Sequence, residues 1–283
     1  MSIRIITDSA SDITQAEAKQ FNIDVLPLKT IFGEEEYLDG ITLDHAGFYQ
    51  KLIESDILPT TSQIAPIEYE EKFRSAVENG DEVVCVTISS KLSGCHQSAC
   101  IAAEEFPGKV VVVDSLNAAL GERLVVQLAL KARDEGKTAA ETAELLNTQK
   151  QSIRLIALLD TLEYLKKGGR ISAASAFAGT LLSIKPVISV ENGEVVTLGK
   201  ARGSKNGNNM LRELVEKNGG INFEMPFALA YTGLDDTLLK KYIADSASLY
   251  VGKVDHLPVY SIGSTIGTHV GPGAIAVAFF SNN

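Results

Sequence analysis

Residues 3–12, IRIITDSASD, join a short β-branched run to a loop of hydroxyls and carboxylates. Two similar runs, Val83 to Ile88 and Val110 to Asp114, follow later in the chain, and helical patterns separate the three. Continuous apolar runs of this length are typical of strands buried on both faces of a parallel sheet. The stretch therefore predicts an α/β fold whose first loop lies at the carboxyl edge of the sheet, where ligands of such folds usually bind.

Local signals predict helices between these strands. Thr14 and Glu17 form a capping box before the first helix, and Pro66 suits the first turn of the next one. Asp24 to Phe32 contains Pro27, so we expect an edge strand or an arm there rather than a central strand. Further helices are expected through His96, Ala99 and Ala102, from Leu120 to Arg133 with Gly136 as its cap, and from Thr138 to Gln149.

The sequence pattern changes near Asp160, after a strand expected from Ile153 to Leu159. Because 283 residues exceed what one compact core usually needs, we expect residues 1–160 to form an N-terminal α/β domain and residues 161–283 a C-terminal α+β domain, with any cleft between them. The second half is expected to begin with a short helix that ends in residues 166–170 (KKGGR). Further helices are expected at Ala173 to Leu182, Asn208 to Lys217 and Asp235 to Ser246, and strands at Val187 to Val190, Val195 to Leu198, Phe227 to Tyr231 and Ala274 to Phe280.

Charge and composition exclude several function classes. A net charge of -10 and a pI near 5.0 argue against a nucleic-acid partner, because phosphate contacts need a basic face. No signal peptide or membrane-spanning run is recognised, and the three cysteines, Cys85, Cys95 and Cys100, are expected to be reduced thiols in the cytoplasm. The cysteines and the four histidines never reach zinc-ligand spacing, so we expect no metal site.

Three catalytic or nucleotide motifs are incomplete. Gly136-Lys137-Thr138 resembles the end of a P-loop, but Lys131 stands where its first glycine is required. The glycines at 271–276 lead into a terminal strand without the helix that a dinucleotide site needs, and Lys91 occupies the first glycine position of a nucleophile elbow around Ser93. We therefore expect no nucleotide cofactor.

Hydroxyl clusters remain as candidate ligand sites. Residues 60–63 (TTSQ) precede the helix that Pro66 opens, and residues 89–94 (SSKLSG) lie between a strand and a helix. At that helix start, Ser93 and the neighbouring amides could hold a carboxylate, although a plain N-cap explains the serine equally well. Asp8 and Asp12 suit turns and caps, so we favour structural over ligand roles for them.

The second half adds a histidine and a basic cluster. His269 lies between glycines that allow close backbone approach, and we favour ligand contact over packing for its ring. Basic residues gather in an otherwise acidic chain, and they form either a solvated face or a patch for an anionic partner or phosphate. They are Lys166, Lys167, Arg170, Lys185, Lys200, Arg202 and Lys205.

With these motifs together, the chain resembles the DegV family from Thr7 almost to its C-terminus. The resemblance depends on residues 7–12 (TDSASD), 60–63 (TTSQ), 89–94 (SSKLSG), 97–99 (QSA), 160–171 (DTLEYLKKGGRI), 185–186 (KP), 267–269 (GTH) and 271–273 (GPG). It implies a two-domain α/β fold with one long-chain fatty acid in a tunnel between the halves. Cys95 and His96 depart from the family pattern, in which Thr or Ser followed by an aromatic residue is expected.

The family also implies roles for particular residues. Thr61, Ser62, Ser93 and Gly94 would bind the fatty acid carboxylate with His269 nearby, and Arg170 and Arg202 would face a kinase partner or the acyl phosphate. In FakB-type members a separate ATP-dependent fatty acid kinase subunit phosphorylates the bound acid for phospholipid synthesis. The chain itself would be a non-catalytic carrier without a cofactor, in transient, peripheral contact with membranes at most.

Two other classes stay open at this point. A serine hydrolase could use Ser93 and His269 with Asp8 or Asp114, in a Ser-His-Asp arrangement. Alternatively, the protein could be a regulatory module that a lipid merely stabilises.

Overall fold

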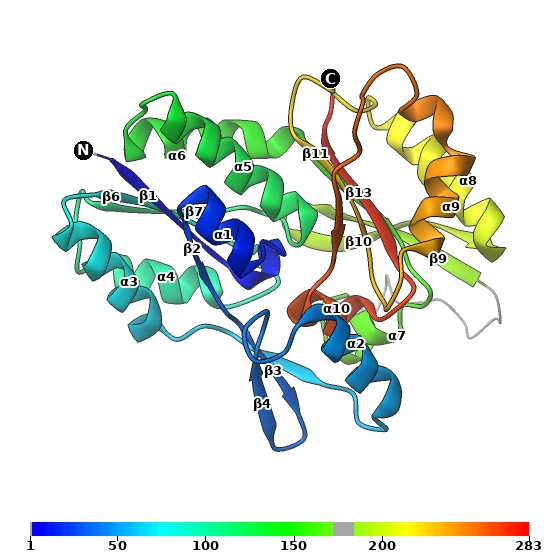
Figure 1. Ribbon diagram of the computed structural model, residues 1–283, viewed down its shortest axis with the longest axis horizontal. Coiled ribbons are helices and arrows are strands. Elements are labelled where there is room, and N and C mark those ends of the chain that lie inside the picture. The colour runs from blue at the N-terminus through cyan, green and yellow to red at the C-terminus, as the bar shows by residue number, and fades with distance from the viewer. Residues whose placement is uncertain (1, 172–183, 283) are drawn as a thin grey trace.

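The computed structural model describes residues 2–171 and 184–282, whose strands form three sheets (Figure 1). The first sheet is parallel throughout and has the strand order β2-β1-β6-β7. Its strands are β1 (Ile3–Asp8), β2 (Asp24–Leu26), β6 (Glu82–Thr87) and β7 (Val110–Asp114). The three strands predicted from the apolar runs are thus found, and they lie in one parallel sheet. β1 and β6 are buried as predicted, whereas β7 is an edge strand and is mostly half-buried.

Helices cover both faces of this sheet because alternate side chains of each strand point to opposite faces. Ile5 and Val84 pack with α5 and α6, whereas Ile6 and Cys85 pack with α3 and α4. The helices are α1 (Gln15–Phe21), α3 (Pro66–Glu78), α4 (Cys95–Ala103), α5 (Leu120–Asp134) and α6 (Ala139–Gln149). The capping box at Thr14 and the Pro66 helix start are both present as predicted.

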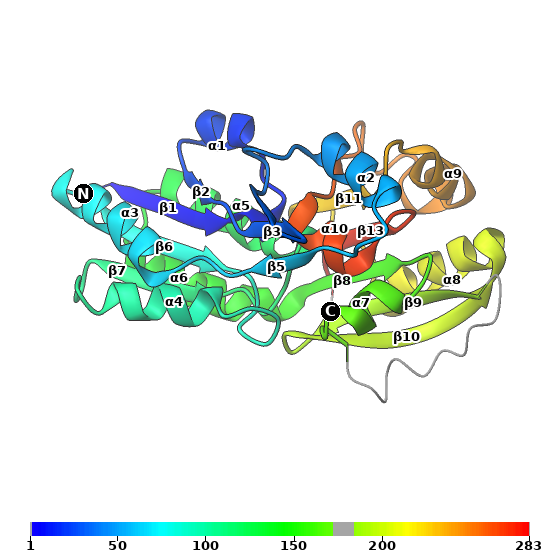
Figure 2. The same ribbon diagram turned by 90° about the horizontal axis from the view of Figure 1, so that it is seen from below.

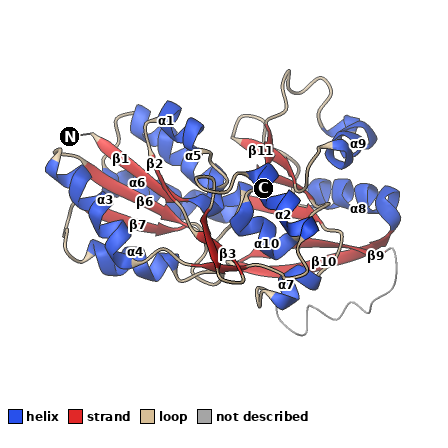
Figure 3. Cartoon of the chain, turned by 60° about the horizontal axis from the view of Figure 1, so that its bottom comes forward, coloured by secondary structure: helices blue, strands red, loops and turns tan. Residues whose placement is uncertain are grey.

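Pro27 divides the segment that was expected to be an edge strand or an arm. Before it, β2 is an edge strand of the parallel sheet; after it, β3 (Lys29–Phe32) is the central strand of a small antiparallel sheet. This sheet has the order β4-β3-β5, with β4 (Glu35–Leu38) and β5 (Thr60–Ser62), and α2 (His45–Glu54) lies between them in sequence. The expectation of an edge strand is confirmed for β2 but is wrong for β3, which pairs on both sides. Pro27 interrupts the ladder between the two strands because it lacks an N–H, and it leaves the residues after it free to pair in a second sheet. Figure 3 shows β3 reaching towards α10 (Ser264–Val270).

The third sheet has six strands in the order β10-β9-β8-β13-β11-β12, antiparallel except for the last pair. They are β8 (Ile153–Leu158), β9 (Ile184–Glu191), β10 (Glu194–Arg202), β11 (Phe227–Tyr231), β12 (Val259–Ser261) and β13 (Ile275–Phe280). Helices α8 (Gly203–Lys217) and α9 (Thr237–Asp245) cover one face (Figure 2). The sheet therefore includes a strand that precedes residue 160, and the domain division at that residue stays a prediction.

Helix α5 connects the two large sheets. Its residues are buried along most of its length, and its core cluster joins Ile5 of β1 to Leu155 of β8 and Ala230 of β11. The face of the six-stranded sheet opposite α8 and α9 is covered in part by α7 (Glu163–Lys167), which packs near α10. Short 3₁₀ turns occur at Ser9–Ser11, Lys150–Ser152 and Ala247–Leu249.

The predicted helix from Ala173 to Leu182 lies outside the described residues. The remaining expected elements of the second half are found, with bounds that differ by a few residues. Among the described helices, none is both long and apolar enough to cross a bilayer.

Candidate functional site

A cavity of about 320 Å³ lies between the carboxyl end of the parallel sheet and one face of the six-stranded sheet. Apolar side chains of both sheets form most of its wall, among them Ile88, Leu155, Ile188, Val190, Ala230 and Ile262. Ligand pockets of this kind are mostly apolar and contain a few convergent polar groups. Eight of the polar lining residues are called the polar end of the cavity: Thr61, Ser62, Gln63, Ser93, Gly94, Arg170, Thr265 and His269. Ser189, Tyr231 and Thr232 also line the cavity.

His269 and Thr61 meet across 208 positions of sequence. Thr61 lies on β5, which pairs with β3, and its hydroxyl is 2.9 Å from Nε2 of His269. His269 lies on α10, a short helix that the sequence analysis did not anticipate among the glycines of residues 267–273. The structure thus brings together two residues that were predicted to bind the same group.

The His269 ring is held in a neutral state. Burial, followed by the positive charge of Arg170, lowers the pKa of His269 to about 4. Its second ring nitrogen, Nδ1, is buried without a hydrogen-bond partner in the described part of the chain. The backbone of Gly168 packs against this ring so closely that a Cβ there would lie 2.2 Å from Nδ1. A glycine at this position is therefore needed to keep the ring in place.

Ser93 and Gly94 form the start of α4 at the same end of the cavity. The N-cap of α4 is Gly94, and the Ser93 hydroxyl just before it accepts a 3.3 Å hydrogen bond from the Cys95 amide while Ser93 also lines the cavity. A Cβ at Gly94 would lie only 1.8 Å from Oε1 of Gln63, which shows how closely the segment after β5 crosses this helix start. The Gln63 amide donates to the Ser98 hydroxyl at 3.0 Å.

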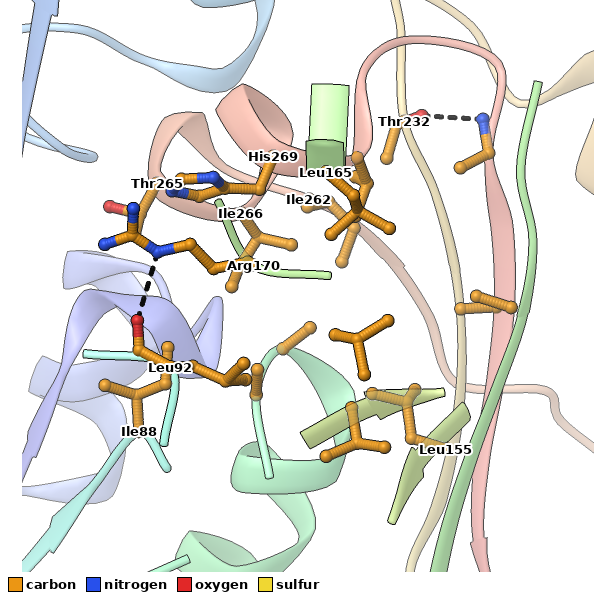
Figure 4. Close-up of a pocket in the computed structure, with 18 of the residues that line it drawn as sticks. Ile88, Leu92, Leu155, Leu165, Arg170, Thr232, Ile262, Thr265, Ile266 and His269 are labelled. Atoms are coloured by element: carbon orange, nitrogen blue, oxygen red, sulfur yellow. Dashed lines mark hydrogen bonds between the residues drawn. The ribbon is translucent and has the colours of Figure 1, made fainter. Parts of the chain in front are cut away.

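The two arginines predicted to face a partner lie in different surroundings. Arg170 is half-buried in the cavity wall beside His269 and Thr265, and its Nε donates to the Leu92 carbonyl at 3.2 Å (Figure 4). Its guanidinium also donates to the Gly168 carbonyl. Arg202 is exposed at the end of β10 and does not line the cavity. The polar end thus contains a positive charge in addition to the expected hydroxyls and amides.

Thr265 is a site residue that the sequence analysis did not single out. It is 3% exposed, and its hydroxyl has no hydrogen-bond partner among the described residues. It lies one helical turn before His269, and Figure 4 shows both beside Arg170. Recognition of a helix at residues 264–270 would have placed Thr265 and His269 on one face.

Acidic side chains near the cavity serve the fold. Asp8 accepts hydrogen bonds from the amides of Ala10 at 3.0 Å and Ile88 at 2.9 Å, and Asp12 accepts one from Gly263 at 2.7 Å. Burial raises the pKa of Asp8 to about 7 despite these amides. Asp39 accepts from the Ser264 amide at 2.9 Å, the Ser264 hydroxyl at 2.7 Å and the Thr265 amide at 3.3 Å. We call Asp8, Asp12 and Asp39 the carboxylate cluster.

The arrangement does not favour a Ser-His-Asp hydrolase. Among the described residues, no hydrogen bond joins Ser93 to His269, whose ring contacts Thr61 instead. Asp8 is engaged by Ala10 and Ile88, and Asp114 accepts from the Leu116 amide at 2.8 Å. A nucleophile, a base and an orienting carboxylate must form a chain of hydrogen bonds, and these residues form none.

Protein-family comparison finds that a model described as an uncharacterised protein of the DegV family matches residues 2–282. Similar curated proteins include a DegV domain-containing protein of Clostridium perfringens, 32% identical over 282 residues, and one of Caldanaerobacter subterraneus, 33% identical over 281 residues. Each alignment covers 98% of both chains.

Solved structures agree with this match over almost the whole chain. A DegV family protein from Thermus thermophilus, described by its fatty acid binding, superposes with a TM-score of 0.88 at 33% identity and covers 99% of this chain and 100% of its own. A stearic-acid-binding protein from Eubacterium ventriosum gives a TM-score of 0.86 at 26% identity, with 98% and 97% covered. DegV of Bacillus subtilis, described as a fatty acid binding protein, gives 0.83 at 28% identity, with 98% of each chain covered.

Proposed function

The chain belongs to the DegV family, and from this premise we propose that it binds one long-chain fatty acid in the cavity, with the carboxylate at the polar end. The observation that carries the proposal is the surplus of donors there. The Thr265 hydroxyl and Nδ1 of His269 are buried without partners among the described residues, and Arg170 adds a positive charge. Nδ1 is a donor in the neutral tautomer in which Nε2 accepts from Thr61. Similar folds are described with fatty acids bound.

The apolar wall and the polar end of the cavity would contribute differently to the free energy of binding. An apolar tail gains about 0.8 kcal/mol per buried methylene, so a sixteen-carbon acid gains on the order of 12 kcal/mol before the costs of association. A carboxylate loses its hydration on burial and is tolerated only where several donors replace the water. The apolar wall would thus supply affinity, and the polar end would fix the orientation.

Native mass spectrometry of the purified protein tests the binding proposal directly. We expect one fatty acid per chain, which organic extraction would release and identify. A delipidated sample should take up one equivalent of an added long-chain acid. A protein that is empty as purified and takes up no added acid would contradict the proposal.

We further propose that the chain is a non-catalytic cytoplasmic carrier, which presents the bound carboxylate to a separate ATP-dependent fatty acid kinase. The incomplete P-loop and dinucleotide motifs of the sequence support a separate source of ATP chemistry. Arg170 reaches the polar end, whereas Arg202 is exposed outside the cavity. This difference suggests that Arg170 acts on the carboxylate or acyl phosphate and Arg202 on the partner surface.

The two arginines can be separated with a purified kinase subunit of this class. Arg202→Ala should retain its full lipid content and form acyl phosphate at least tenfold more slowly. Arg170→Gln should lower both lipid retention and acyl-phosphate formation. Arg74→Ala, which removes an exposed arginine from α3, is the matched control and should change neither. Wild-type rates in both test variants would contradict the carrier role as stated.

A further inference from the structure

A histidine and a cysteine form a pair on α4, away from the cavity. His96 and Cys100 lie four residues apart and therefore on one face of the helix, and Nε2 of His96 is 3.5 Å from Sγ of Cys100. Both residues are half-buried, and neither lines the cavity. Thiolate sulfur and imidazole nitrogen are ligands that zinc commonly takes in proteins.

Thr87, which is fully buried, contacts the other ring nitrogen of His96. Its hydroxyl on β6 lies 3.1 Å from Nδ1 of His96. A proton on Nδ1 would be donated to this hydroxyl and would leave the lone pair of Nε2 free beside Cys100. Metal-binding histidines usually donate their other ring N–H in this way, because the second contact fixes both the tautomer and the ring orientation.

The spacing of the two atoms matches a tetrahedral chelate. With a Zn–S bond of about 2.3 Å and a Zn–N bond of about 2.0–2.1 Å, a tetrahedral angle puts sulfur and nitrogen about 3.6 Å apart. The observed 3.5 Å is close to this separation. We propose that His96 and Cys100 bind a thiophilic divalent cation, zinc in the first place, with Thr87 as a positioning residue.

Two carboxylates lie near Cys100. Asp114 and Glu104 are close enough to act electrostatically on its thiol. Their negative charges attract a cation to this face of α4.

The site differs from the zinc sites that sequence spacing was expected to reveal. Within residues 2–171 and 184–282, no group of three or more His, Cys, Asp and Glu side chains is placed to hold a metal ion. His96 and Cys100 would therefore be the two protein ligands, with water in the other positions. Two ligands bind more weakly than the four of a structural site and leave positions open for exchange.

Metal titration of the purified full-length protein tests the pair. We expect one equivalent of zinc to bind at micromolar concentration in competition with a chromophoric chelator, and cobalt(II) to give a thiolate charge-transfer band. Cys100→Ser and His96→Gln should each lower the zinc affinity at least tenfold, and Cys100→Ser should abolish the cobalt band. His256→Gln, which removes an exposed histidine elsewhere, is the matched control and should bind as the wild type.

Alkylation gives a second readout, whose first measurement uses the wild type alone. Cys85 and Cys95 are fully buried, so Cys100 is the accessible thiol of the three. Zinc should slow its alkylation in the wild type, as mapped by peptide mass spectrometry, and Thr87→Val should weaken this protection about tenfold. Equal alkylation rates with and without zinc, or a zinc affinity that neither variant lowers, would overturn the proposal.

Discussion

Two groups of polar residues lie between the sheets, and their hydrogen bonds differ. The carboxylate cluster is engaged by backbone amides: Asp8 accepts two, Asp39 accepts two together with a hydroxyl, and Asp12 accepts one. At the polar end of the cavity, Thr265 and Nδ1 of His269 have no partner among the described residues. Buried polar groups are normally paired. Oδ2 of Asp12 also lacks a partner among the described residues, but each carboxylate of the cluster accepts at least one backbone amide, whereas the Thr265 hydroxyl and Nδ1 of His269 have none. This difference agrees with the proposal that an anion binds at the polar end.

The two groups are also physically connected. Asp39 receives the amides of Ser264 and Thr265, which begin α10, and α10 carries Thr265 and His269 to the cavity. A carboxylate at a helix start satisfies amides that have no partner within the helix. Asp39, a member of the carboxylate cluster, therefore stabilises the start of α10, the helix that carries Thr265 and His269 of the polar end.

The largest loss of stability is expected when Asp39, which connects the two groups, is replaced. Asp39→Ala leaves three donors unpaired at a residue that is 2% exposed, and we expect the free energy of unfolding to fall by about 3 kcal/mol or more. Urea unfolding followed by circular dichroism measures the loss. Asp44→Ala removes the exposed cap of α2 and should cost only about 1 kcal/mol. Equal losses in the two variants would show that Asp39 is an ordinary cap.

A smaller effect should appear on acidification of the lipid-free protein. His269 binds a proton near pH 6.5 in the unfolded chain but only near pH 4 in the folded protein. The unfolded state therefore holds more protons between these values, and stability falls as the pH falls from 6.5 to 4. We expect the wild type to lose about 2 kcal/mol more than His269→Gln over this range. Because both proteins contain Asp8, its titration cancels, and parallel pH profiles would contradict the assignment.

The smallest effects are expected from two threonines of α10, one of which should affect fatty acid affinity and the other stability. Thr265→Val removes an unpartnered hydroxyl, so stability should be unchanged while fatty acid affinity falls about tenfold. Thr268→Val removes a hydroxyl that donates to the Ser264 carbonyl at 2.8 Å and does not line the cavity. It should lose about 1 kcal/mol of stability and keep its affinity. Calorimetric titration with delipidated protein and thermal unfolding provide the two measurements, and the reverse pattern would exchange the roles of the two residues.

Much of the framework could be predicted from local sequence. Apolar runs predicted β1, β6 and β7, and the Thr14 capping box and Pro66 predicted two helix starts. Pro27 predicted the edge strand β2, but not that β3 after it is the central strand of a second sheet. These features depend on side-chain periodicity and on hydrogen bonds within a few residues, which the sequence displays directly. The roles of individual carboxylates are less local, and Asp8 gained its Ile88 amide only through the sheet.

The sequence by itself determined the parallel sheet, most helices and a set of hydroxyls, amides and basic residues that resembles one family. Only the tertiary structure decided that Thr61 reaches His269, that Thr265 is buried unpaired, and that Arg170 lines the cavity while Arg202 does not. It also decided that α10 forms among glycines, because Asp39, 225 residues away from Ser264, satisfies its first amides. Contacts between distant segments depend on how the sheets pack, and no short-range pattern records that packing.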